Sequence, residues 1–71
     1  MSKYVIVIEK TQTGYSAYAP DLPGCITTGK TLEETKHNMG EAIDFHLDSM
    51  RRGGDPISPP TTAVAEYDAV A

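Results

Sequence analysis

The sequence predicts a small α+β domain of the order β-β-β-α-β, with three antiparallel strands, one helix on one sheet face and a short fourth strand. Three observations predict this class. Residues 4–8 are all β-branched or aromatic, and two clusters of turn-forming residues separate the short runs that follow. A stretch with helical periodicity then begins near residue 32. At 71 residues the chain has room for one domain, residues 1–71.

The first strand is expected at residues 4–8, where the run Tyr-Val-Ile-Val-Ile ends at two charged residues. Residues 11–14, Thr-Gln-Thr-Gly, form a turn, since Gly14 tolerates a positive φ, and a second strand follows at 15–19. Side chains alternate along a strand. Tyr4, Ile6 and Ile8 therefore share one face, and Val5 and Val7 share the other.

A second reversal is predicted at the structural motif Pro20, Asp21, Leu22, Pro23, Gly24 and Cys25. Each proline fixes φ, and Gly24 tolerates conformations that other residues avoid. Asp21 is interpreted as a turn residue whose carboxylate caps backbone amides. Cys25 begins the third strand, residues 25–28, as a small buried side chain.

A helix is predicted to begin at about Leu32, because Thr31 and Glu34 form a capping box, and Gly53 and Gly54, followed by Pro56, are expected to stop it. Arg51 and Arg52 suit the negative end of the helix dipole. At about 100° per residue an apolar stripe faces the sheet. It consists of Leu32, Thr35, Met39, Ala42, Ile43, His46, Leu47 and Met50.

After the stiff connector of residues 56–60, residues 61–67 alternate weakly and are expected to form the fourth strand. A strand-helix-strand connection within one sheet is right-handed, so this strand should lie parallel to its neighbour.

The first strand is apolar on both faces, whereas one helix covers only one face of a sheet. Soluble monomers rarely expose a contiguous apolar patch. We therefore expect self-association into a dimer or tetramer, with Tyr4, Ile6 and Ile8 as oligomer-interface candidates, or a partner on the second face. The alternative is that the C-terminal segment folds back over that face.

Charge limits the classes of partner. Ten Asp and Glu against six Lys and Arg give a net charge of −4, which disfavours nucleic-acid binding and favours a basic protein partner. A single cysteine excludes an internal disulfide, and the apolar run 4–8 is too short to span a membrane. A cytoplasmic protein is expected.

Acidic residues gather on the helix side opposite the apolar stripe, with Phe45 near them. Like charges at this spacing cost helix stability, so the face is interpreted as a docking site for a basic partner, although a merely solvated face is the alternative. The partner-binding candidates are Glu34, Glu41, Asp44, Phe45 and Asp48.

No catalytic, cofactor or metal site is predicted. His37 and His46 lie nine residues apart, about 180° around the helix, so they cannot chelate one ion. Phosphate-binding glycine loops and clustered cysteines are absent from the sequence.

The segments Tyr-Ala-Pro-Asp-Leu-Pro-Gly-Cys at 18–25, Thr-Gly-Lys-Thr-Leu-Glu-Glu at 28–34 and Glu-Ala-Ile at 41–43 resemble the HicB family of antitoxins, over residues 3 to 60. The resemblance implies a partial ribonuclease H-like fold without nuclease activity. It also implies binding of HicA, a small basic toxin that cleaves messenger RNA. Many members carry a further C-terminal DNA-binding domain, and none is expected in these 71 residues.

The leading hypothesis is therefore a type II antitoxin that neutralises a HicA-like toxin by occlusion. The alternative is a free-standing, self-associating structural module with no toxin partner. A degenerate nuclease is a third reading, suggested by fold resemblance alone.

Overall fold

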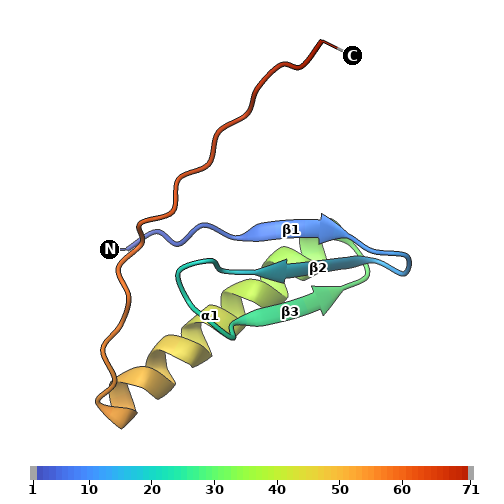
Figure 1. The fold of residues 1–71 in the computed structure, drawn as a ribbon. Coiled ribbons are helices and arrows are strands. Elements are labelled where there is room, and N and C mark those ends of the chain that lie inside the picture. The colour runs from blue at the N-terminus through green and yellow to red at the C-terminus, as the bar shows by residue number, and fades with distance from the viewer. Residues whose placement is uncertain (1, 71) are drawn as a thin grey trace.

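The computed structural model describes residues 2–70. It contains three strands followed by one helix: β1 (Val7–Lys10), β2 (Tyr15–Tyr18), β3 (Ile26–Gly29) and α1 (Leu32–Gly53). The strands form one antiparallel sheet in the order β1-β2-β3, and α1 packs across one of its faces (Figure 1). The predicted α+β class is thus confirmed, whereas the ribonuclease H-like classification stays a prediction.

The first strand lies further along the chain than predicted. β1 begins at Val7, opposite Tyr18, so residues 4–6 extend past the last paired residue of β2. The chain turns away from the sheet at Pro20, which leaves the main chain of residues 4–6 without a strand partner. The length of β2, rather than the composition of residues 4–8, therefore decides where β1 begins.

The predicted fourth strand at residues 61–67 is wrong. Residues 55–70 contain no helix or strand, and the chain beyond the helix runs past the start of the N-terminal segment and then away from the sheet (Figure 1). The first amides of the predicted strand do not bond to another strand. Thr61 and Thr62 donate their backbone N–H groups to the Asp21 carboxylate at 3.1 and 3.0 Å. Pro59 and Pro60 have no N–H to donate.

The core lies between the sheet, the second turn and the helix. Its fully buried apolar residues come from three elements: Ala17, Ala19, Leu22, Cys25 and Met39. Tyr4, Ile6, Ile8, Ala42, Ile43 and Leu47 pack around them. Leu22 and Cys25 belong to the reversal between β2 and β3, which is closed by bonds from Leu22 N to Ala19 O and from Cys25 N to Leu22 O, both 3.0 Å. Gly24 takes a φ of 82° there, as the turn requires.

The helix limits agree with the sequence signals. Thr31 Oγ1 accepts the Glu34 amide at 3.1 Å, while Glu34 Oε1 accepts the amide of Lys30 at 2.9 Å rather than that of Thr31. At the other end, Gly54 adopts the left-handed conformation and donates to Arg51 O. Of the predicted apolar stripe, Thr35 and Met39 are buried, and Ala42, Ile43 and Leu47 pack against the core. His46 and Met50 are half-buried, and Leu32 in the first turn is 44% exposed.

Candidate partner-binding surfaces

The predicted partner-binding residues lie together on the side of α1 away from the sheet. At about 100° per residue they span an arc of about 100°. They lie on the opposite side of the helix from the buried Thr35 and Met39, and every one of them is exposed. This acidic helix face consists of Glu34, Glu41, Asp44, Phe45 and Asp48.

Most carboxylates of the acidic helix face have a local contact. Glu34 caps the helix start. Glu41 Oε1 lies 3.5 Å from His37 Nε2, and Asp48 Oδ2 lies 3.1 Å from Arg52 Nε. An exposed ion pair such as that between Asp48 and Arg52 contributes at most about 1 kcal/mol. Asp44 forms no ion pair with any residue of 2–70, which makes it the carboxylate best placed to meet a cationic group.

Phe45 is the aromatic residue of this face. Its side chain is 77% exposed, which is unusual for a large apolar residue. Solvation of an aromatic ring is unfavourable, and buried aromatic anchors dominate many protein interfaces. A partner that covers Phe45 would gain apolar burial beside the carboxylates.

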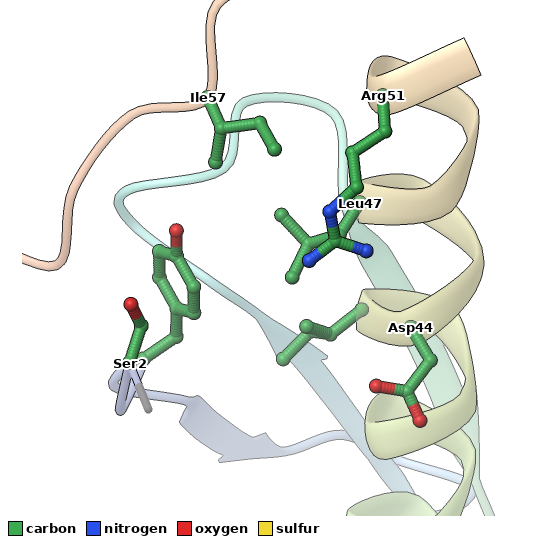
Figure 2. A pocket seen from close by; sticks show the side chains of 7 residues that line it. Ser2, Asp44, Leu47, Arg51 and Ile57 are labelled. Atoms are coloured by element: carbon green, nitrogen blue, oxygen red, sulfur yellow. The ribbon is translucent and has the colours of Figure 1, made fainter.

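A groove of about 600 Å³ lies beside the acidic helix face, between the N-terminal segment, α1 and the connector after it. Figure 2 shows Asp44, Leu47 and Arg51 reaching into it from the helix, with Ile57 and Ser2 on the facing side. Tyr4 and Ile43 complete its lining. Because Asp44 borders both the groove and the acidic helix face, the two surfaces are continuous.

The oligomer-interface candidates lie on the face of the sheet that the helix covers. Tyr4, Ile6 and Ile8 are half-buried and pack against the core, and Tyr4 also lines the groove, so their role in self-association stays a prediction. The sequence did not show which face the helix covers, and the packing of Met39 and its neighbours decides it. By alternation, Val5 and Val7 belong to the opposite face.

That opposite face carries an apolar row across all three strands. Val7 pairs with Tyr18, and Tyr18 pairs with Ile26. Tyr18 and Ile26 are 40% and 71% exposed. Sequence reasoning missed this outer row because it depends on strand register. The sequence signal that could have indicated the outer row is that its residues are β-branched or aromatic.

Asp21 holds the chain that follows the helix. Its Oδ2 accepts the Thr61 and Thr62 amides, and its Oδ1 accepts the two threonine hydroxyls at 2.9 and 3.0 Å. The Thr62 amide foremost, together with these other donors, lowers the pKa of the Asp21 carboxyl below its usual value. Asp21 thus caps backbone amides as predicted, but they belong to the chain after the helix, some 40 residues away, rather than to the turn in which Asp21 lies.

A second contact fastens the same segment. Tyr4 donates its hydroxyl hydrogen to Ser58 O at 2.7 Å. Together with the Asp21 contacts this bond forms the tail anchor, which ties residues 58–62 to the N-terminal segment and to the second turn. Neither contact follows from sequence spacing, because both join residues far apart in the chain.

Groups with catalytic potential are few. Cys25 is buried, and burial raises the pKa of its thiol, so it suits packing rather than nucleophilic attack. Within residues 2–70, no three histidine, cysteine or carboxylate side chains come together as ligands for a metal ion. Nor does the described part of the chain contain a helix of the length and apolarity that crossing a membrane requires.

Known proteins with similar sequences cover most of the chain. A protein from the rep-hol intergenic region of Haemophilus phage HP1 is 39% identical over 64 residues, which are 90% of this chain and 47% of that protein. A UPF0150 protein of Thermoplasma acidophilum is 39% identical over 78% of this chain and 81% of its own length. The chain thus spans about half of the phage relative.

A solved structure and a family profile both match this chain. The structure of a HicA3 and HicB3 toxin-antitoxin complex contains a chain that matches with a TM-score of 0.73 and 35% identity, over 83% of this chain and 70% of that one. The profile of the HicB-like antitoxins of bacterial toxin-antitoxin systems matches residues 4–70. With nearly its whole length matched, this chain belongs to the HicB-like antitoxin family.

Proposed function

We propose that this protein is the antitoxin of a type II toxin-antitoxin system, and that it neutralises a small basic HicA-like toxin by covering the surface with which the toxin cleaves messenger RNA. The observation that carries the proposal is the likeness, at a TM-score of 0.73, to a chain of a HicA3 and HicB3 complex. In this proposal the protein acts in the cytoplasm by binding the toxin and catalyses no reaction. The chain itself makes no contact with nucleic acid.

The acidic helix face and its neighbouring groove support this partner class. Asp44 offers an exposed carboxylate at their junction, and Phe45 adds an apolar anchor that is 77% exposed. A net charge of −4 attracts a basic protein over distance and speeds its encounter. Docking of the toxin across Phe45 and into the groove would bury this apolar surface.

Co-expression tests the proposal directly. The protein is produced together with the small basic protein encoded beside its gene, and growth and co-purification are measured. We expect this chain to relieve growth arrest and to elute with its partner. The proposal is wrong if the neighbouring protein neither co-purifies nor is neutralised.

Charge reversal on the helix then locates the interface. Asp44→Lys and Glu41→Lys should slow association with the toxin at low salt, and the effect should shrink as salt screens the charges. Glu9→Lys is the matched control, since Glu9 is also exposed but lies on β1. An equal loss in Glu9→Lys would show that only net charge matters and would remove the acidic helix face from the interface.

The second candidate function is a self-associating module that has no toxin partner. The outer row of Val7, Tyr18 and Ile26 favours it, because an uncovered apolar row on a sheet invites burial against another molecule. A dimer or tetramer in solution together with no toxin capture would support this candidate over the antitoxin.

A further inference from the structure

The last residues of the chain leave the body of the protein with their apolar side chains uncovered. Past the tail anchor, Val64, Tyr67 and Val70 are 72%, 91% and 103% exposed. No helix or strand includes residues 63–70, so their backbone lacks ladder partners. These eight residues, here named the tail, carry apolar surface and hydrogen-bonding groups that a folded chain ordinarily buries or pairs.

The tail has the residue pattern of a half-buried strand. In an extended chain, odd-numbered residues share one face, which here is wholly apolar and holds Tyr67 among three alanines: Ala63, Ala65, Tyr67 and Ala69. The even-numbered face holds Glu66 and Asp68 between the two valines. This period of two suits a strand at the edge of a sheet, with one face packed and one in water.

The sheet has an edge that can receive such a strand. In the order β1-β2-β3, β1 pairs on one side only. The segment before β1 is extended as well, since residues 4–6 continue past the end of β2. An edge of this kind is a template for one more strand. Lys3 and Lys10 flank it with two positive charges against the one carboxylate of β1, Glu9, so the edge still complements Glu66 and Asp68 of the tail.

The tail is poorly placed to reach the β1 edge of its own molecule. The tail anchor fixes residues 58–62, and prolines 56, 59 and 60 stiffen the chain before them. Beyond the tail anchor the chain runs away from β1 (Figure 1). A return would need a sharp turn just after Thr62, where residues 63–67 contain no glycine, proline, asparagine or aspartate.

We propose that two copies of this protein exchange their tails, each adding residues 63–70 as a fourth strand to the β1 edge of the other. A stiff hinge that directs a strand away from its own sheet favours such an exchange. Both interfaces are the same by symmetry, so the dimer closes and no edge is left for further addition at β1.

Molar mass tests the exchange with purified protein and without any toxin, so its failure is separate from failure of the antitoxin role. Light scattering should give twice the chain mass of 7.7 kDa. Tyr67→Asp should raise the dimer dissociation constant at least about tenfold, since the aromatic anchor of the added strand becomes charged. Phe45→Asp is the matched control, because Phe45 is equally an exposed aromatic but lies on the helix, and it should leave the dimer intact.

Isotope-filtered nuclear Overhauser spectra decide between exchange and pairing within one copy. Labelled and unlabelled chains are unfolded together, refolded and examined for contacts between the tail and β1. We expect contacts between different copies. Contacts only within one copy, a monomeric wild type, a dimer unaffected by Tyr67→Asp, or tail contacts that require added toxin would each overturn the proposal.

Discussion

Replacing Gly29 with alanine would put a methyl group into the contact between β3 and the start of α1. A Cβ atom at this position would lie 2.9 Å from the Thr35 amide nitrogen, 3.0 Å from Thr35 Cα and closer still to the Thr35 hydroxyl. Thr35 has little freedom to move away. It is fully buried, and its hydroxyl donates to Thr31 O at 2.7 Å. Either the helix or the strand must therefore shift.

The expected cost follows from this geometry. Overpacking of a close contact by one methyl group destabilises a protein by about 1–3 kcal/mol. A domain of this size has roughly 4–10 kcal/mol of stability in total, so the substitution removes a large part of it. Since 1 kcal/mol corresponds to about 4–8 °C in Tm for such a domain, Gly29→Ala should melt at a clearly lower temperature.

The same substitution at Gly40 provides a matched control with the opposite sign. Gly40 lies inside α1, and apart from the surrounding helix backbone a Cβ atom there would meet nothing within 4 Å. Alanine in a helix interior is favoured over glycine by about 0.5–1 kcal/mol, so Gly40→Ala should stabilise the protein.

Urea unfolding followed by circular dichroism measures both variants at one protein concentration. We expect the midpoint to fall for Gly29→Ala and to rise for Gly40→Ala. If Gly29→Ala were as stable as the wild type, the close packing of β3 on the helix start would not exist in solution, and the reasoning from this contact would be refuted.

Three further predictions concern the tail anchor, the helix start and the thiol. Hydrogen bonds led by that of the Thr62 amide lower the pKa of Asp21, so the anchor should hold at pH above the usual carboxyl value of 3.8 and be lost as the pH falls through the lower value of the folded protein. Protection of the Thr62 amide against exchange should be lost in that acidic range, and Asp21→Ala, which removes both acceptor oxygens, should lack this protection already at neutral pH; a protected Thr62 amide in the variant would contradict the anchor. Thr31→Ala removes the acceptor of the Glu34 amide and should cost about 1 kcal/mol in urea unfolding, whereas an unchanged midpoint would mean that water replaces the cap. Burial raises the pKa of Cys25, so iodoacetamide should label it slowly at neutral pH and rapidly in denaturant; rapid labelling of the folded protein would show that the turn opens.

Local sequence signals determined much of the fold. The capping pair Thr31 and Glu34 and the glycines at 53–54 set the helix at residues 32–53, because helix ends are decided by hydrogen bonds within a few residues. Turn residues at 11–14 and 20–24 likewise determined the antiparallel order of the three strands. The middle of the apolar stripe, which needs only periodicity, was predicted correctly, since Thr35, Met39, Ala42, Ile43 and Leu47 are buried or pack against the core.

The sequence also predicted that the residues of the acidic helix face lie together, since positions on one helix have fixed angular relations. Its role in binding stays a prediction. The family could likewise be inferred from the motif at residues 18–34, and the match over residues 4–70 confirms it.

Only the tertiary structure decided which face of the sheet is covered, and with it the placing of Ile6 and Ile8 in the core and of Tyr18 and Ile26 outside it. It also decided that residues 61–67 do not join the sheet, because the Asp21 carboxylate, from a distant turn, accepts hydrogen bonds from the Thr61 and Thr62 amides. The physical reason is common to both. Periodicity and turn chemistry act between residues close in the chain, whereas burial and long-range hydrogen bonds depend on which distant segments meet.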